Sequence, residues 1–340
     1  MPAYCTLAGT RLEIRLAQGL AYAMLSAIIV PMSLASVLAE IQRDPKLASR
    51  ITHWHKLPER PALYGHWPLE LDHRLVHCLQ ERGIERLYRH QTNAVEAALQ
   101  RENVVVVTPT ASGKTLCYNL PVVNTLMGDT GSRALYLFPT KALAQDQLAE
   151  LGALQASLGE KLGSFTYDGD TPQQARANVR RTARIVISNP DMLHAGILPH
   201  HTRWARFFQG LRYVVLDEIH TYRGVFGSHV ANVLRRLKRI CTFYGAKPQY
   251  LCSSATIANP LELTERLVEE SFTLIGQEQD GSPQGEKHFL FYNPPIVDRQ
   301  LGIRRSAVSD SRSLGERFLE AGVQTIVFAR ARLTTEVLLT

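Results

Sequence analysis

The chain has 340 residues, which is long enough for two domains and a sizeable buried core. Apolar residues make up 45% of it and charged residues 20%, a balance that is typical of globular proteins and argues against extended disorder. The formal net charge is +7, and residues 176–239 alone contain twelve Lys or Arg residues against three acids. A basic face of this kind suits a phosphate backbone, although charge clusters also occur on ordinary solvated surfaces.

The five cysteines are far apart in the sequence and form no C-x-x-C pair. They are Cys5, Cys78, Cys117, Cys241 and Cys252. This pattern suggests neither a zinc site nor a disulfide framework, and it favours reduced thiols in a cytoplasmic protein.

The first feature along the chain is an apolar run from Leu16 to Ala39 that contains no charged residue. Two arginines, Arg11 and Arg15, precede it, and residues 37–39 resemble a signal cleavage site. Taken alone, the run could be a signal peptide or a membrane anchor. The motifs downstream require ATP, which an exported protein would lack. We therefore expect no membrane association and a cytoplasmic, nucleoid-associated protein.

A second interpretation makes Met32 the true start and residues 1–32 an uncertain upstream extension. From there apolar residues recur at i, i+3, i+4 and i+7, which predicts an amphipathic helix at the start of a segment spanning 33–70. Residues 54–68 then mix prolines with aromatic rings, so we expect an extended arm instead of a regular element. The helix positions are Leu34, Val37, Leu38 and Ile41.

Residues 71–275 alternate short β-branched runs with helical stretches, which predicts parallel strands joined by crossover helices. The runs are apolar at nearly every position, as expected for strands that are covered on both faces. The predicted fold class is therefore α/β, with a parallel sheet flanked by helices. The candidate strands are residues 103–107, 133–138, 184–187, 212–216 and 249–253.

Two candidate adenine contacts precede the first of these strands. Gln91 lies at the start of a predicted helix and could bond adenine through N6 and N7, and Tyr88 is near enough in sequence to stack on the base. A lone glutamine is also common as a solvated helix residue.

Residues 108–115 follow a strand and precede a helix, which is the context of a phosphate-binding loop. Backbone N–H groups there can converge on phosphates. Lys114 would reach the β- and γ-phosphates of ATP, and the Thr115 hydroxyl would bind Mg²⁺. Thr108 replaces the first glycine of the strict motif, so a chance Gly-Lys-Thr turn stays an alternative. The predicted cofactor-binding residues of this loop are Thr110, Ala111, Ser112, Gly113, Lys114 and Thr115.

Two loops that follow predicted strands are candidates for a nucleic-acid track. Each lies at the same edge of the sheet as the phosphate loop, where N–H groups, hydroxyls and the Lys141 ammonium can contact a sugar-phosphate backbone. The alternative is that both loops are helix caps. The candidate contacts are Pro139, Thr140 and Lys141 in one loop, and Asn189, Pro190 and Asp191 in the other.

The sequence Asp217-Glu218-Ile219-His220 ends an apolar run, which puts its carboxylates at the carboxyl edge of a central strand. Asp217 can anchor Mg²⁺, and Glu218 can orient the water that attacks the γ-phosphate. His220 joins them and Lys114 as a candidate catalytic residue. Asp-Glu pairs also occur as simple strand ends.

Three residues after the last strand, Ser254, Ala255 and Thr256, are candidates for coupling ATP to movement. Their hydroxyls could bond to the acidic motif and report the state of the nucleotide. A Ser-Ala-Thr tripeptide is common, so the sequence alone gives this role little support.

A break in the apolar pattern at Gly276–Gly285 predicts an exposed linker over 276–286. A second domain then begins and occupies 287–340, with a strand near 287–292, a helix near 306–320, another strand at 324–328 and the start of a helix. This is too little to close a second nucleotide-binding sheet, so we expect the chain to be a fragment.

The order of these motifs resembles that of superfamily 2 helicases. The similarity runs from about Leu34 to the end, and further segments resemble MrfA-type bacterial helicases and their fungal Hrq relatives. Those segments are residues 137–147, 167–172, 194–201 and 221–229.

The resemblance implies a DNA-stimulated ATPase and 3′-to-5′ DNA helicase of genome repair, built from two RecA-like lobes and a C-terminal zinc-binding region. It identifies 71–275 as the first lobe, a P-loop NTPase, and 325–330 as the first motif of the second lobe. Later motifs, including an arginine finger, are not found before Thr340. We therefore predict that this fragment binds ATP weakly and hydrolyses it slowly or not at all.

Two other functions fit the same residues. One is an RNA helicase or a translocase that does not unwind, because the sequence does not show how the 2′-OH is treated. The other is a non-catalytic fragment whose basic stretch, 176–239, binds nucleic acid. The expected partner is single-stranded DNA or a tailed duplex, with RNA as an alternative, and no repair protein is identified.

Overall fold

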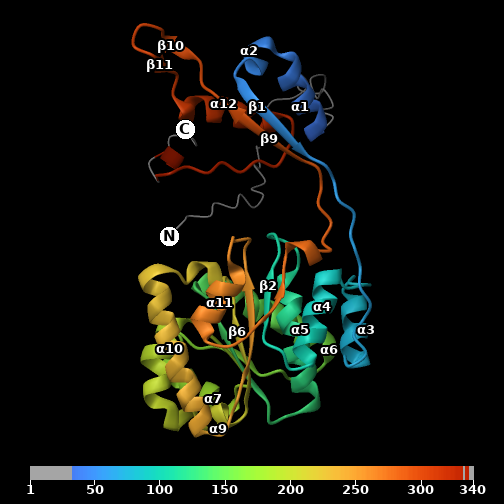
Figure 1. The fold of residues 1–340 in the computed structure, drawn as a ribbon, viewed down its shortest axis with the longest axis vertical. Helices are drawn as coiled ribbons and strands as arrows, with labels where there is room; N and C mark the ends of the chain where they lie inside the picture. Colours follow the sequence, from blue (N-terminus) through green and yellow to red (C-terminus); the bar gives the residue numbers. More distant parts are fainter. Residues whose placement is uncertain (1–32, 332–333, 337–340) are drawn as a thin grey trace, which may run out of the picture. The chain divides into compact units, whose positions relative to one another are not determined.

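The computed structural model describes residues 33–331 and 334–336, and the chain divides into two compact units. The larger unit runs from Glu59 to Gly285 (Figure 1). The smaller unit combines the described residues up to Pro58 with those from Glu286 onward. The part of the apolar run before residue 33 and the proposed extension 1–32 lie outside the described residues. Among the residues that are described, no helix is both long and apolar enough to span a bilayer.

The larger unit is built on a seven-stranded sheet in which all neighbouring strands are parallel. The α/β fold class is confirmed, and all five predicted strands are present. Two strands of three residues each, β4 and β8, lie at the two edges of the sheet and are too short to give a sequence pattern. In spatial order the strands are β4 (Ser164–Thr166), β5 (Ile185–Ser188), β3 (Arg133–Leu137), β6 (Leu211–Leu216), β7 (Gln249–Ser254), β2 (Val104–Val107) and β8 (Thr273–Ile275).

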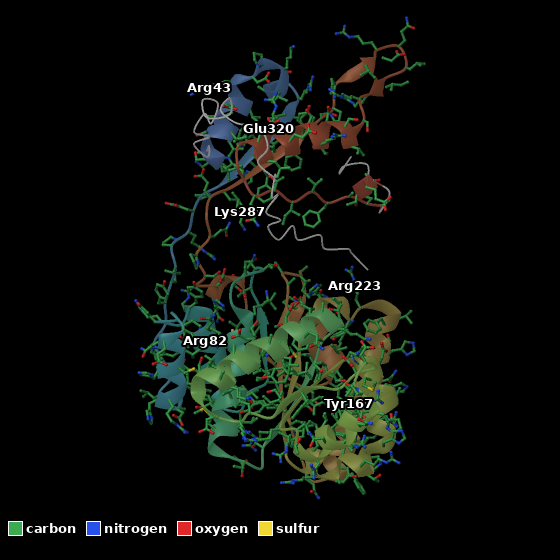
Figure 2. The ribbon with its side chains drawn as sticks, turned by 180° about the vertical axis from the view of Figure 1, so that it is seen from behind. Arg43, Arg82, Tyr167, Arg223, Lys287 and Glu320 are labelled. Carbon is green, nitrogen blue, oxygen red and sulfur yellow. The ribbon has the colours of Figure 1, made fainter. Side chains whose placement is uncertain are left out.

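Helices cover both faces of this sheet (Figure 1). Alternate residues of β2 show the consequence, because Val104 and Val106 enter one apolar core while Val105 and Val107 enter the other. The view from behind in Figure 2 shows side chains filling the layers between sheet and helices. One core is closed by α3 (His73–Glu81), α4 (Arg89–Leu99), α5 (Lys114–Gly128) and α6 (Lys141–Leu158), and the other by α7 (Gln173–Thr182), α9 (Ala205–Gln209), α10 (Gly224–Phe243) and α11 (Pro260–Val268).

The smaller unit pairs two segments that are far apart in the sequence. Strand β1 (Ile51–Leu57) runs antiparallel to β9 (Lys287–Tyr292), and Val37 and Ile41 pack in a separate small core with Ala321. The predicted amphipathic helix is confirmed, since it buries Val37, Leu38 and Ile41. The other elements of this unit are α1 (Leu34–Arg43), α2 (Pro45–Ala48), β10 (Ile296–Asp298), β11 (Ile303–Arg304) and α12 (Ala307–Glu320).

Two sequence predictions in this part of the chain are wrong. Residues 54–57 belong to β1 instead of an irregular arm, because β9 supplies a hydrogen-bonding partner that the sequence could not reveal. Residues 324–328 form no strand, and Ile326 and Phe328 are exposed. A strand needs a neighbour to satisfy its N–H and C=O groups, and none of the described strands lies beside this segment.

The predicted exposed linker is in fact packed into the larger unit over residues 280–282, whereas Glu278 is exposed. Asp280 is 1% exposed and forms an ion pair with Arg60. Arg89 at the start of α4 donates to the carbonyl of Glu278 (2.7 Å), and a Cβ at Gly281 would lie 2.2 Å from the Leu63 carbonyl oxygen. The polar composition of this segment therefore reflects internal hydrogen bonds, not solvent exposure.

Candidate nucleotide-binding site

The loop between β2 and α5 has the shape of a phosphate-binding turn. Ala111 and Gly113 both have positive φ values (64° and 79°), and Gly113 caps the N-terminus of α5. The Thr108 hydroxyl is hydrogen-bonded to the Ser112 hydroxyl (2.6 Å), and both residues are buried. Thr108 therefore closes the turn with a side-chain bond at the position where the strict motif has glycine.

Lys114 is the first residue of α5, and its ammonium group stays over the loop. It donates to the carbonyls of Thr108 (2.9 Å) and Pro109 (3.1 Å). Thr115 follows on the same turn and contacts the hydroxyl of Tyr118. The helix N-terminus adds partial positive charge, so this corner of the molecule favours an anion.

Asp217 lies at the end of β6 and connects three elements. The Tyr118 hydroxyl on α5 donates to its Oδ2 (3.1 Å), the Ser253 hydroxyl on β7 donates to its Oδ1, and the backbone N–H of Glu218 also donates to Oδ1 (2.8 Å). Burial, and then the charge of Glu218, raise the pKa of Asp217 to about 6, while the charge of Lys114 acts in the opposite direction. Lys114 and Asp217 thus share one electrostatic environment.

Glu218 and His220 extend this cluster toward the end of β7. Glu218 adopts a left-handed backbone (φ 52°), which is uncommon for a residue with a side chain and turns the chain sharply after β6. Nδ1 of His220 lies 3.1 Å from Oε2 of Glu218 and 3.3 Å from the N–H of Ala255. One nitrogen cannot accept from Ala255 and donate to Glu218 at the same time, so the two contacts belong to ring states without and with a proton on Nδ1.

The coupling segment contacts the acidic motif through different atoms from those we predicted. Ser253 makes the hydroxyl bond to Asp217, whereas the Ser254 hydroxyl is buried and has no partner. Side chains alternate along a strand, and Ser253 points to the same face of the sheet as Asp217 because Leu216 pairs with Cys252 one position earlier. Ala255 takes part through its N–H. No hydrogen bond connects Thr256 with the acidic motif.

Gln91 and Tyr88 lie beside the phosphate loop, but the side-chain amide of Gln91 already forms a hydrogen bond through both its oxygen and its nitrogen. Its amide donates to the Gly113 carbonyl (3.0 Å) and accepts from the Tyr88 N–H (2.9 Å), and the residue is 2% exposed. The Tyr88 ring is stacked between Tyr64 (5.5 Å) and His90 (6.0 Å). The helix start therefore holds the phosphate loop directly.

The two loops predicted as a nucleic-acid track act as helix caps through their polar side chains. Thr140 caps α6 by accepting from the Leu143 N–H (3.4 Å), and Asn189 caps the short helix α8 (Pro190–Met192) by accepting from the Met192 N–H (2.8 Å). Lys141 is exposed and paired with Asp170 (2.6 Å). Pro139 is half-buried, Pro190 is buried and Asp191 is exposed. All six residues do lie at the carboxyl edge of the sheet.

Tyr118 and Ser253, which hold Asp217 in place, were not predicted from the sequence. Tyr118 is four residues after Lys114 on α5, and that spacing puts two helical side chains on one face, so it was a usable signal. Ser253 lies inside the predicted strand, two residues after the apolar Leu251. Side chains two residues apart in a strand point to the same face of the sheet, which here is the face of Asp217. No sequence signal identified the ring stack of Tyr64, Tyr88 and His90.

Comparisons with known proteins agree with this geometry. The DEAD/DEAH box helicase pattern matches residues 88–264. The chain is 53% identical over 302 residues to the "Uncharacterized ATP-dependent helicase YprA" of Bacillus subtilis, covering 89% of this chain and 40% of YprA. It is 36% identical to the "ATP-dependent helicase HRQ1" of Saccharomyces cerevisiae, covering 90% of this chain and 28% of HRQ1.

A solved structure extends the similarity to three dimensions. It is the crystal structure of the "DUF1998 helicase MrfA bound to DNA and AMPPNP", which is 51% identical and has a TM-score of 0.86. The match covers 90% of this chain and 42% of MrfA. The chain therefore spans less than half the length of these relatives.

Proposed function

This chain belongs to the DEAD/DEAH box helicase family, and from that premise we propose that residues 59–285 are the ATP-binding motor domain of a DNA helicase. The observation that supports this most is the position of Asp217. Its carboxylate is bonded at once to the helix that carries Lys114 and to the strand that precedes the Ser254-Ala255-Thr256 segment. A change at the phosphate loop therefore has a short physical route to the rest of the sheet.

Lys114 would bind the β- and γ-phosphates of ATP, and the N–H groups of the loop would cradle them. Reaching the phosphates requires the ammonium to leave the Thr108 and Pro109 carbonyls, which is an exchange of bonds at the same place in the fold. Neighbouring Thr110, Ala111 and Gly113 are exposed, so their backbone is open to a ligand.

Mg²⁺, when bound with ATP, supplies the positive charge that stabilises the transferring phosphoryl group. Thr115 and Asp217 would hold it, and their donor atoms, a hydroxyl and a carboxylate, are the oxygen ligands that Mg²⁺ prefers. The raised pKa of Asp217, about 6, fits such a role, because a buried carboxylate without a full counter-charge is relieved by a cation.

Glu218 would orient the attacking water, since its backbone turn projects it from the end of β6. His220 would position Glu218 through the 3.1 Å contact and pass its state to Ala255. We place adenine beside Tyr88 and Gln91. Because the Gln91 amide already bonds Gly113 and Tyr88, an adenine contact would exchange one of those bonds and so be felt by the phosphate loop.

DNA is the proposed track, with Thr140, Lys141, Asn189 and Asp191 along the carboxyl edge. The MrfA structure is bound to DNA, and the family resemblance adds 3′-to-5′ movement and a role in repair to the proposal. The caps at Thr140 and Asn189 do not oppose this, because capped loops still present backbone N–H groups and Lys141 to a phosphate chain.

The test is ATP turnover with and without single-stranded DNA or RNA, on this chain and on a longer protein that extends to the length of YprA. We expect the longer protein to hydrolyse ATP faster with DNA than with RNA. Equal turnover with and without nucleic acid would reject the motor function, and stimulation by RNA alone would make the protein an RNA helicase. Nucleic-acid binding without any ATP binding would leave only a non-catalytic binding fragment.

A further inference from the structure

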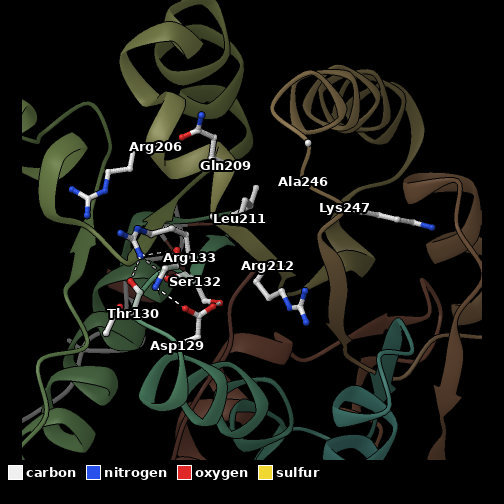
Figure 3. A pocket seen from close by; sticks show the side chains of 13 residues that line it. Asp129, Thr130, Ser132, Arg133, Arg206, Gln209, Leu211, Arg212, Ala246 and Lys247 are labelled. Atoms are coloured by element: carbon white, nitrogen blue, oxygen red, sulfur yellow. Dashed lines mark hydrogen bonds between the residues drawn. The ribbon is translucent and has the colours of Figure 1, made fainter.

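The amino edge of the sheet, opposite the ATP site, contains three adjoining hollows. The first, of about 540 Å³, is lined by the segments that begin β3 and β6 and by residues 245–247 before β7 (Figure 3). A second hollow of about 650 Å³ shares residues 245–247 with it. A third, of about 460 Å³, shares Arg206. Since shared residues join the hollows, we treat them as one surface and call it the amino-edge groove.

The groove is lined by exposed or half-exposed cations from separate segments of the chain. None of them forms an ion pair with a carboxylate of the described residues. Figure 3 shows Arg206, Arg212 and Lys247 around the central hollow. Arg101 lines the second hollow together with Lys247. The cations that line the groove in this way are Arg101, Arg180, Arg181, Arg203, Arg206, Arg212 and Lys247.

Other basic residues of this edge have structural roles and are not counted. Arg133 donates to the carbonyls of residues 130–132 (2.8, 2.9 and 2.8 Å). Arg184 donates to the carbonyls of Leu126 and Asp129 near the end of α5. Lys238 is paired with Glu270 (2.7 Å). Each of these three cations is already bonded within the protein, so none of them needs a ligand.

The acids of the groove do not balance the remaining cations. Asp129 accepts from the Gly131 N–H (2.8 Å) and the Ser132 hydroxyl (2.6 Å), and Glu270 is held by Lys238. Burial, and then the nearby charge of Arg212, lower the pKa of Arg101, as expected where like charges gather without an anion.

We propose that the amino-edge groove binds the phosphodiester backbone of a nucleic acid, as a second contact surface on the edge of the sheet opposite the ATP site. The Arg-rich lining suits phosphate, because guanidinium groups match its oxygens with paired N–H donors. A protein partner fits less well. Tight protein interfaces need large apolar or aromatic anchors, and Tyr250, Leu211 and Cys241 of the linings are all buried.

This surface goes beyond the proposed function and does not depend on ATP. It would hold a stretch of DNA that has not reached, or has already left, the carboxyl edge. The contacts read no bases, so we expect binding that is independent of sequence and strongly dependent on salt.

The test uses the intact chain without nucleotide and a labelled oligonucleotide, single-stranded or duplex, in a salt titration. The groove variant is Arg206→Gln/Arg212→Gln/Lys247→Gln. The matched control, Arg43→Gln/Lys46→Gln/Arg299→Gln, removes the same charge from three exposed positions of the smaller unit. For the groove variant we expect roughly tenfold weaker binding at low salt and a salt slope smaller by about 0.9 per lost contact with duplex, or about 0.7 with a single strand.

The control variant should keep the wild-type salt slope. Equal losses in both variants would overturn the proposal, because the effect would then follow net charge alone. Wild-type affinity and slope in the groove variant would overturn it as well. If polyglutamate binds as tightly as DNA and shows the same loss, the groove is a site for an acidic protein. Lys114→Ala, measured beside them, shows whether DNA binding persists when the ATP site is disabled.

A second measurement needs no variant and so cannot be confused by misfolding. DNA bound in the groove should protect Lys247 from acetylation by an amine reagent, by several-fold relative to the free chain. Lys46, which is also exposed and unpaired, should be modified equally with and without DNA. Equal modification of Lys247 in both conditions would overturn the proposal.

Discussion

At the carboxyl edge of the sheet the charged groups are partly buried and bonded to one another, whereas at the amino edge most are exposed and without an ionic partner. Asp217 accepts three hydrogen bonds, from α5, β7 and the N–H of Glu218, while Arg206, Arg212 and Lys247 form no ion pair with a carboxylate in the part of the chain that the structure describes. A cluster of the first kind can position a reacting group, because its geometry is fixed. One of the second kind can attract a polyanion without orienting it.

The two edges also differ in whether their residues are neighbours in the sequence or far apart in it. Loops that follow parallel strands place neighbouring residues of the sequence at the ligand, as in residues 113–115 and 217–218. The amino-edge groove collects single residues from segments more than a hundred positions apart, such as Arg101 and Lys247. Only the folded chain brings such residues together.

The largest expected effect is at the carboxyl edge. Lys114→Ala should reduce ATP turnover in the longer protein by at least about 100-fold, because it removes the main cationic contact to the transferring phosphate. Turnover of Lys46→Gln, a cation of the smaller unit, should stay within about twofold of wild type. Steady-state phosphate release measures both. Intact turnover in Lys114→Ala would show that the carboxyl edge is not the catalytic edge.

A buried charge should matter for stability in a way that exposed charges do not. Asp280→Ala removes a fully buried carboxylate that pairs with the half-exposed Arg60 and accepts two hydrogen bonds from Ser282, and it should lower the free energy of unfolding by about 2 kcal/mol, measured in urea. Glu286→Ala removes an exposed pair with Lys56 and should change the free energy of unfolding far less than Asp280→Ala does. Equal losses would mean that the 278–282 segment is not anchored by this ion pair.

The same segment predicts a pH effect on stability. Burial alone raises the pKa of Asp280, but hydrogen bonds from Ser282 and Arg60 outweigh it and bring the pKa below its ordinary value. The stabilisation is then present above the unfolded pKa of about 3.9 and is lost as the pH falls through the lower folded value. Urea unfolding of wild type and Asp280→Ala should converge at that acidic end, and a constant difference would contradict the assignment.

Asp217 should give a pH dependence of ligand binding in a higher pH range. Its pKa is about 6, so below pH 6 the carboxylate is increasingly protonated and cannot bind a cation. We expect the Mg²⁺-dependent part of ATP affinity to fall up to about tenfold for each pH unit below 6, measured by fluorescent-nucleotide titration. Asp217→Asn should remove this dependence. The exposed arginines of the amino edge do not titrate in this range, so DNA binding should change little.

The smallest effect distinguishes two neighbouring serines. Ser253→Ala removes a hydroxyl that bonds Asp217 and should reduce ATP turnover by several-fold, up to about tenfold. Ser254→Ala removes a buried hydroxyl without a partner and should change turnover by less than about twofold. The reverse ranking would show that the sheet register near the acidic motif is not as the structure has it.

The α/β class, the five central strands and the candidate residues of a nucleotide-binding site could be predicted from the sequence. These follow from local rules, since buried parallel strands are uniformly apolar and ligand loops follow them directly. The phosphate loop, the Asp217-Glu218 pair and the amphipathic helix at 34–43 were all predictable for this reason.

Tertiary structure decided what depends on partners distant in the sequence. Strand β1 exists because β9 pairs with it, and residues 324–328 form no strand because none of the strands in residues 33–331 and 334–336 pairs with them. Asp280 and Ser282 are buried because Arg60 bonds to both, although the composition of the segment around them resembles that of a linker. The register of β7 against β6 decides that Ser253, and not Ser254, bonds to Asp217. The crossover connections between the strands bring the cations of the amino edge together. Local patterns in a sequence encode which face a residue occupies, but not which distant group it will meet there.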